Sequence, residues 1–170
     1  MITPAYCALM ARYNAWVNVR IYAAVAALDD SERKRDRGAF FGSMHETLNH
    51  LLWADRTWLG RFTREPFEVP DFGRGMHEHF DELRAARTSA DAAMLAWAER
   101  VPQPWLDGAL RYTSRVDGRT RELPGAVAAV HLFNHGTHHR RQLTTLMKQA
   151  GLDPGVTDVP WLPGLSRIVD

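Results

Sequence analysis

The sequence has little that would indicate a secreted or membrane protein. Its 170 residues include one cysteine, Cys7, so the chain cannot form an internal disulfide. No apolar run approaches the roughly 18 residues of a membrane-spanning helix, and no basic stretch followed by a hydrophobic signal core opens the chain. Because disulfides belong to oxidising compartments, these features predict a cytoplasmic protein with Cys7 as a buried structural thiol.

Net charge is also nearly absent. Lys and Arg total 21 against 20 Asp and Glu, which leaves a formal charge of +1. The basic cluster Arg33-Lys34-Arg35 is short and is followed at once by Asp36. We therefore expect neither nucleic acid nor an anionic membrane as a partner. The hydrophobic fraction of 45% is typical of a soluble protein, and the length predicts one domain over residues 1–170.

Four long segments carry apolar residues at the spacing of an amphipathic helix. They cover residues 4–28, 43–62, 76–98 and 124–151, with a polar connector at 29–41. Ser43 followed three residues later by Glu46 is a capping-box pattern, and Gly151 suits a helix C-terminal cap. The pattern predicts an all-α fold, a four-helix bundle in which ligand sites lie between facing helices.

The region between the third and fourth helical segments has a different pattern. In residues 110–123, short β-prone runs flank the dipeptide Asp117-Gly118. Asp-Gly favours a tight hairpin turn, in which both central residues have positive φ. We predict a small two-stranded hairpin inserted before the last helix.

Histidine is abundant near the C-terminus, where four of the eight histidines fall within nine residues: His131, His135, His138 and His139. Helical residues four apart lie one turn above each other, so such a pair can direct two imidazoles at one metal ion. Helical phase places His139 near the middle of the apolar stripe and His135 on its flank. The phase favours His135 and His139 as the inward pair, with His131 and His135 as the competing pair.

Two histidines do not hold a metal ion tightly, so a third ligand must come from another helix. Residues 43–62 offer His45, Glu46, His50 and Asp55. Asp55 points into the apolar stripe of that segment, and a buried carboxylate is costly unless an arginine, a histidine or a metal ion partners it. His50 lies on a second facet, so helical phase leaves the third ligand open.

Three motifs taken together resemble the DinB family. They are residues 13–18 (YNAWVN), 47–59 (TLNHLLWADRTWL) and 131–140 (HLFNHGTHHR), in the right order. The resemblance covers nearly the whole chain and implies a four-helix bundle of the DinB/YfiT type, commonly a homodimer. Carried over residue by residue, it implies a metal site formed by His50, His135 and His139. Arg141 departs from the pattern, because many such proteins have Gly there, but the departure changes no ligand.

Three histidines leave at least one coordination position for water or a substrate atom, as in catalytic zinc sites. The sequence does not identify the divalent transition metal, and we expect zinc or nickel. Gly136 follows His135, so the His-Glu-x-x-His pattern of zincin proteases is absent. A general base would have to come from elsewhere, and Asp55, His138 and Glu46 are the candidates.

Two classes of function remain open at this point. The family is similar to a wider superfamily of thiol-dependent S-transferases and isomerases, which implies a metal-dependent enzyme acting on a small molecule, with a low-molecular-weight thiol as partner. A metal-dependent hydrolase acting on small molecules is the related enzymatic hypothesis. The alternative is a non-catalytic, stress-associated metal-binding protein that acts as a dimeric interaction partner, whose ion ties the second helix to the fourth.

Overall fold

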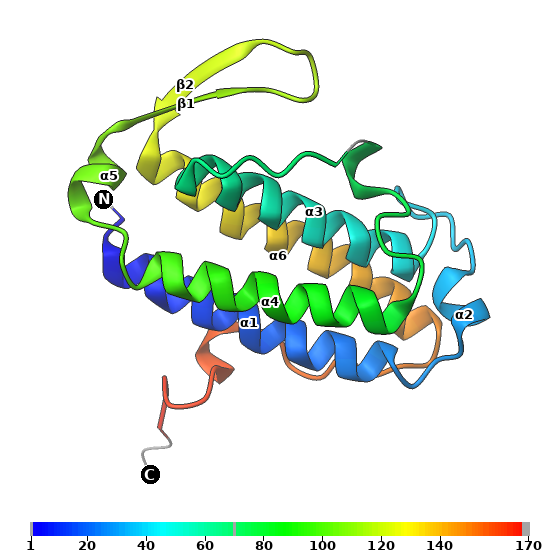
Figure 1. Ribbon diagram of the computed structural model, residues 1–170. Coiled ribbons are helices and arrows are strands. Elements are labelled where there is room, and N and C mark those ends of the chain that lie inside the picture. Colours follow the sequence, from blue (N-terminus) through cyan, green and yellow to red (C-terminus); the bar gives the residue numbers. More distant parts are fainter. Residues whose placement is uncertain (1, 70, 168–170) are drawn as a thin grey trace.

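The computed structural model describes residues 2–69 and 71–167, which are mostly helical with one two-stranded antiparallel sheet (Figure 1). The long helices are α1 (Pro4–Val25), α3 (Met44–Thr63), α4 (Phe80–Ala98) and α6 (Gly125–Gln149). The shorter elements are α2 (Asp30–Lys34), η1 (Asp71–Gly73), α5 (Gln103–Asp107), β1 (Ala109–Thr113), β2 (Thr120–Pro124) and η2 (Val159–Trp161). The predicted helical class and hairpin are confirmed.

The long helices lie side by side (Figure 1), and apolar residues of all four are buried. Helix α1 packs against α4 and α6, and α3 packs against the same two helices. The apolar stripe predicted for α6 is buried, including Leu132, Leu143 and Met147. Leu48 and Leu52 of α3 are buried in the same core as Leu143 and Met147. This packing brings together the two helices that carry the candidate metal ligands.

The predicted caps occur at two helix ends. The Ser43 side chain accepts a hydrogen bond from the Glu46 N–H, which satisfies a backbone donor in the first turn of α3. Gly151 follows α6 with a φ of 75°, a left-handed conformation that costs glycine little. Local side-chain chemistry therefore defines these two boundaries.

Two segments differ from the prediction. Helix α4 begins at Phe80 rather than near residue 76, because the chain turns at Gly75, where φ is 62°. The connector at 29–41 contains the short helix α2, whose first turn is capped by the Asp29 carboxylate accepting from the Glu32 N–H. Both differences arise from turn and cap residues outside the apolar periodicity.

The loop of the hairpin is longer than predicted. Its strands pair in one register, from Ala109 opposite Pro124 to Thr113 opposite Thr120. The tight two-residue turn was a wrong prediction, because residues 114–119 all lie between the strands and only Gly118 among them has positive φ. Asp117 instead forms an ion pair at 2.7 Å with Arg121, which holds a longer loop.

A buried set of polar side chains crosses the interior between the long helices. Arg87 of α4 lies between two carboxylates, with Nη1 2.8 Å from Oδ2 of Asp55 and Nη2 2.8 Å from Oδ1 of Asp91. Asn18 of α1 donates a hydrogen bond to Asp91 at 2.9 Å. The Arg87, Asp55 and Asp91 residues are 3%, 2% and 6% exposed. An arginine is thus the partner that the buried Asp55 requires.

The same network reaches α6. Asn14 of α1 donates to Asp91 at 3.2 Å, and its Oδ1 accepts a hydrogen bond from Arg140. Arg140 is buried and directly follows His139. Gly136 leaves room for this contact, because a Cβ there would lie 3.0 Å from Nη1 of Arg140 and 3.3 Å from Oδ1 of Asn14. The network therefore positions the segment of α6 that carries the histidines.

The single thiol is buried, as predicted. Cys7 lies inside α1 with no exposed surface, and burial raises its pKa to about 11. The thiol is therefore protonated at neutral pH and is a poor nucleophile. Among the described residues, no helix is both long enough and apolar enough to cross a membrane.

Candidate metal centre

Three histidines meet between α3 and α6. One ring nitrogen each from His50, His135 and His139 lies within 4.8 Å of the others. The ring centroids are 5.3 Å apart for His50 and His135, 4.6 Å for His50 and His139, and 4.4 Å for His135 and His139. Tetrahedral zinc, with nitrogens at about 2.0–2.1 Å, separates its ligand atoms by about 3.3 Å. Small side-chain rotations would therefore bring these nitrogens to ligand distance.

Hydrogen bonds orient two of the three rings. Nδ1 of His50 lies 3.0 Å from the Phe72 carbonyl oxygen, and Nδ1 of His139 lies 2.8 Å from Oε1 of Gln142. Each contact assigns the proton to Nδ1 and leaves Nε2 as the free lone pair. Nδ1 of His135 is buried without a hydrogen-bond partner among the described residues. This donor set fits a divalent transition metal ion.

The carbonyl that orients His50 comes from an unusual backbone segment. Asp71, Phe72 and Gly73 have φ values of 57°, 54° and 82°, so three successive residues are left-handed. Such conformations are costly for residues with a Cβ and persist where the surroundings hold them. At Gly73 a Cβ would lie 2.3 Å from Cβ of Trp53, so only glycine fits. The close approach of η1 to α3 thus depends on this glycine.

Aromatic rings surround His50. The Phe41 ring stacks on it with centroids 4.0 Å apart, and the Trp53 ring stacks at 5.6 Å. The Phe41 ring also lies 5.5 Å from that of His139. Apolar surfaces therefore shield His50 from water, although Phe40, the neighbour of Phe41, is 82% exposed.

The surroundings keep the three imidazoles neutral. Burial lowers the pKa of His50 to about 4 and the pKa of His135 to about 3, and the other imidazoles of the cluster add to the shift of His135. Burial also lowers the pKa of His139. Neutral imidazole is the form that binds metal ions, so the site needs no deprotonation at pH 7.

The metal-free protein is expected to lose stability as the pH falls from about 6.5 towards 4. Unfolded histidines titrate near pKa 6.5, above the folded values of about 4 for His50 and about 3 for His135, so the unfolded chain binds more protons in this window. The free energy of unfolding must then fall as the pH falls through this window. Urea denaturation at a series of pH values measures it. The free energy of unfolding of His135→Gln should fall less steeply with falling pH than that of wild type. An identical pH dependence in the two proteins would contradict the prediction.

Comparisons with known proteins identify the family. The model of the DinB family matches residues 1–166. This chain belongs to the DinB family. Protein DinB of Bacillus subtilis strain 168 is 23% identical over 160 residues, 86% of this chain and 87% of that protein. The Uncharacterized protein YrdA of the same strain is 28% identical over 121 residues, 67% of this chain and 68% of that protein.

A solved structure shows the same fold. The crystal structure of a DinB-like protein from Bacillus cereus has a TM-score of 0.58 to this DinB-family chain at 20% identity. The similarity covers 83% of this chain and 91% of that one. At this level of identity the comparison shows the fold alone.

The other predicted ligands of this DinB-family protein have different contacts. His45 is buried with Nε2 2.7 Å from the His77 carbonyl oxygen. The Glu46 carboxylate accepts from the Gly75 N–H at 2.9 Å. The carboxylate of Asp55 is paired with Arg87 inside the core. The third histidine of the cluster is therefore His50, the one that the resemblance implies.

The remaining histidines of α6 lie beside the cluster. His131 is exposed, with its ring 5.7 Å from that of His135 and 4.7 Å from that of Trp58. His138 is exposed, with its ring 4.8 Å from that of His139. The structure thus groups the pair that helical phase favours, His135 and His139.

Sequence reasoning missed the groups that orient the rings. Gln142 follows His139 by three residues, so helical spacing could have identified it as a hydrogen-bond partner. The Phe72 carbonyl belongs to an irregular segment, and no sequence pattern marks it. Phe41 lies in the connector that the prediction describes only as polar.

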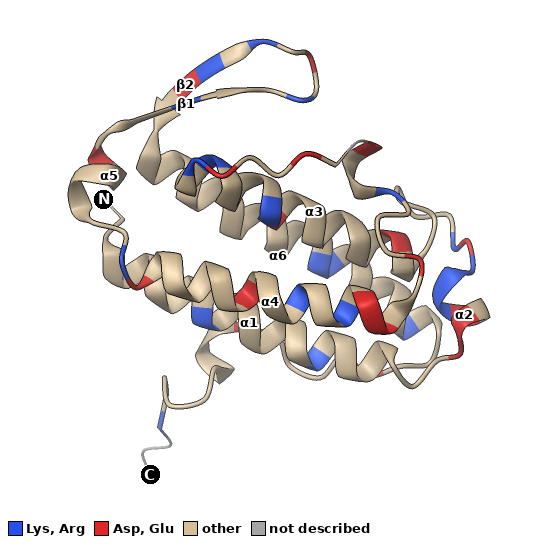
Figure 2. Ribbon diagram, viewed as in Figure 1, with Lys and Arg blue, Asp and Glu red and all other residues tan. Residues whose placement is uncertain are grey.

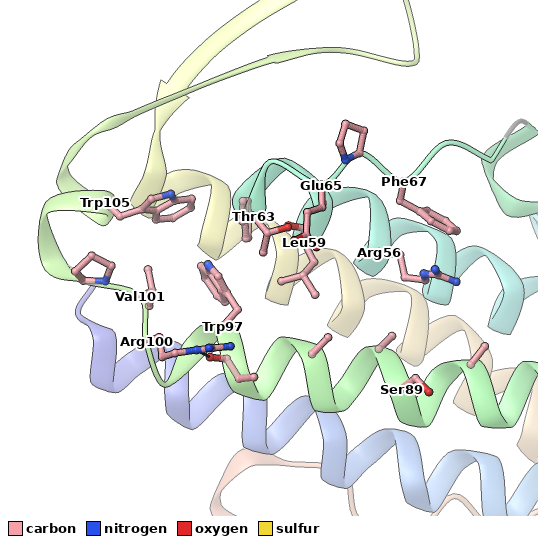
Figure 3. Close-up of a pocket in the computed structure, with 18 residues that line it drawn as sticks. Arg56, Leu59, Thr63, Glu65, Phe67, Ser89, Trp97, Arg100, Val101 and Trp105 are labelled. Atoms are coloured by element: carbon pink, nitrogen blue, oxygen red, sulfur yellow. Dashed lines mark hydrogen bonds between the residues drawn. The ribbon is translucent and has the colours of Figure 1, made fainter.

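A groove of about 850 Å³ lies between α3 and α4, away from the cluster (Figure 3). Leu59 of α3 and Trp97 of α4 point toward each other across it. Arg56 and Arg100 also line it, but none of the three clustered histidines is among its described lining residues. The groove is therefore separate from the candidate metal centre.

Proposed function

We propose that this DinB-family protein binds one divalent transition metal ion, zinc or nickel, through His50, His135 and His139. The observation that carries the proposal is the convergence of three neutral imidazoles from α3 and α6. Hydrogen bonds from Nδ1 already orient two of the rings. Imidazole suits zinc and nickel alike, so the availability of the metals decides between them. We infer that the long helices form a four-helix bundle of the DinB/YfiT type around this site.

Three protein ligands would leave a coordination position for water or a substrate atom. When bound, the ion would lower the pKa of coordinated water toward about 7 or stabilise a thiolate. The residues around it supply the rest of the site. The Phe72 carbonyl and Gln142 hold two imidazoles in place, and Phe41 and Trp53 exclude water from His50.

Of the predicted general bases, we favour His138. Its imidazole is exposed beside His139, and its Nε2 lies 3.4 Å from Nε2 of Gln142. An imidazole at the edge of the site could accept a proton from a substrate at this nitrogen. Asp55 is buried and neutralised by Arg87, so a structural role accounts for it.

For the reaction, we propose metal-dependent transfer of a low-molecular-weight thiol to a small electrophile, by a protein that assembles as a homodimer. Family membership supports both parts of this proposal. The open coordination position supports the reaction, since a thiolate could be held and oriented there.

Elemental analysis and a thiol-conjugation assay test the proposal. Tag-free protein is expected to contain about one equivalent of zinc or nickel and to accelerate the conjugation of glutathione or cysteine to 1-chloro-2,4-dinitrobenzene. Protein that stays metal-free after both metals are supplied would overturn the metal site. Turnover of ester substrates without thiol would support a hydrolase instead. Bound metal with neither activity would support the non-catalytic alternative, in which the ion ties α3 to α6.

A further inference from the structure

A small basic cavity lies beneath the hairpin. Its volume is about 360 Å³, and it lies among the C-terminal end of α3, the residues around α5, and β1. Arginines and apolar side chains line it, including Arg61, Arg64, Arg111, Phe62, Trp105 and Leu110. No acidic residue is among its described lining residues. Figure 2 shows basic ribbon at this end of α3, with acidic ribbon in the segment that follows it. The described lining of the cavity therefore carries positive charge and no carboxylate.

Arg61 is the best positioned of the three arginines. Its guanidinium carbon lies 4.4 Å from the ring centroids of both Trp58 and Tyr112, so the side chain is held by aromatic rings. Its single hydrogen bond among the described residues is a long one, 3.5 Å from Nη2 to the Thr113 carbonyl oxygen. Burial lowers the pKa of Arg61, and Arg115 adds to this shift. Most of its donors are available to a ligand.

Among the described residues, no acidic side chain forms an ion pair with Arg61. Glu122 faces Arg111 across the hairpin register, yet these two described residues form no ion pair. Glu65 lines the groove between α3 and α4 rather than this cavity. The Asp107 carboxylate accepts a hydrogen bond from Gln103. The arrangement therefore suits an anionic ligand, which could accept hydrogen bonds from Arg61.

A row of rings connects Arg61 with the candidate metal centre. The Trp58 ring, which contacts the Arg61 guanidinium, lies 4.7 Å from the ring of His131. The ring of His131 lies 5.7 Å from that of His135. Arg61 follows His50 by eleven residues on α3, which corresponds to about 16 Å along the helix. A single elongated small molecule could span this distance.

We propose that the ligand of the three-histidine centre carries a phosphate or carboxylate group that Arg61 binds in the cavity beneath the hairpin. The inference rests on the proposed metal site and narrows its substrate class to elongated small-molecule anions. Trp58 and Tyr112 hold the guanidinium in place, so its planar fork can bind two oxygens at once. Specificity for an anionic ligand would follow from this contact.

Binding of inorganic phosphate tests the inference. Titration calorimetry is expected to show binding to wild type that Arg61→Met weakens by about tenfold, the loss of a charge-assisted contact. Arg100→Met is the matched control, because Arg100 is exposed and lines the other groove. Arg61→Gln provides a second variant if Arg61→Met does not fold, as judged by circular dichroism. Equal phosphate affinity in wild type and the folded Arg61 variant would overturn the inference.

Cobalt-loaded protein separates this inference from the metal proposal. Paramagnetic relaxation of the phosphate ³¹P signal is expected to place phosphorus roughly 10–20 Å from the ion, the span estimated from the helix rise. A distance of about 3 Å would mean direct ligation and would overturn the Arg61 site. If the protein takes up no cobalt but still binds phosphate through Arg61, the metal proposal is overturned. The inference that one ligand reaches both the metal ion and Arg61 is then overturned as well, and Arg61 forms an independent anion site.

Discussion

Replacing His135 with alanine is expected to weaken zinc binding by more than about 100-fold. Loss of a hydrogen-bond partner of a metal-ligating histidine costs about 10–100-fold, and loss of the ligand itself should cost more. The variant would retain only His50 and His139, which come from different helices. Competition with a chromophoric chelator measures the zinc affinity. The fold should survive, because the half-buried His135 ring makes no hydrogen bond through Nδ1 within the described structure.

His131→Ala is the matched control for this prediction. His131 lies one turn before His135 on the same helix and belongs to the competing pair that the sequence allows. Because its ring lies beside Trp58 and outside the three-histidine group, the variant should bind zinc as wild type does. An equal loss of zinc affinity in His131→Ala and His135→Ala would show that His131 and His135 are the ligands. Unchanged affinity in His135→Ala would remove this histidine from the site.

Replacing Arg87 with methionine is expected to lower the free energy of unfolding by about 3–5 kcal/mol. Removal of one member of a buried ion pair leaves the other charge without compensation, and Arg87 is the shared partner of Asp55 and Asp91. Burial raises the pKa of Asp91 even with Arg87 present, so its carboxylate depends on this cation. Urea denaturation followed by circular dichroism measures the loss.

Arg84→Met serves as the comparison for Arg87. Arg84 lies on the same helix but is exposed, so its replacement should change stability by no more than about 0.5 kcal/mol. Adding Asp55→Asn to Arg87→Met should recover part of the loss, because it removes one uncompensated charge. If Arg87→Met were no less stable than Arg84→Met, the network would not hold the helices together.

The network also bears on the candidate metal centre. Arg140 follows His139 and bonds Asn14, which contacts Asp91. Loss of Arg87 is therefore expected to disturb the segment of α6 that carries His135 and His139. Stability and site geometry are coupled here because Asn14 of α1 joins Asp91 of α4 to Arg140 of α6.

Local chemistry explains which features the sequence could predict. The helical periodicity, the Ser43 cap of α3 and the placement of His139 near the buried face all depend on neighbours within one or two turns. The hairpin was predicted for the same reason, although its turn was not. There the Asp117 carboxylate pairs with Arg121 across the loop, a contact that the Asp-Gly signal does not describe.

His50, the third histidine of the cluster, could not be identified from spacing within one helix. Helical phase alone did not distinguish His50 from His45, Glu46 or Asp55, and only the family resemblance selected it. In the folded protein, Arg87 neutralises Asp55 across 32 residues of sequence, and His45 contacts the His77 carbonyl. Neither partner can be found from spacing within α3.

The sequence by itself predicted the long helices and favoured His135 and His139 over His131 and His135 as the inward pair on α6, because both predictions follow from residues three or four apart. Only the tertiary structure decided that His50 completes the cluster, that Phe72 and Gln142 orient it, and that an uncompensated Arg61 lies beneath the hairpin. These contacts depend on how helices and irregular segments pack against each other. Packing distances are a property of the whole folded chain, and a one-dimensional pattern does not contain them.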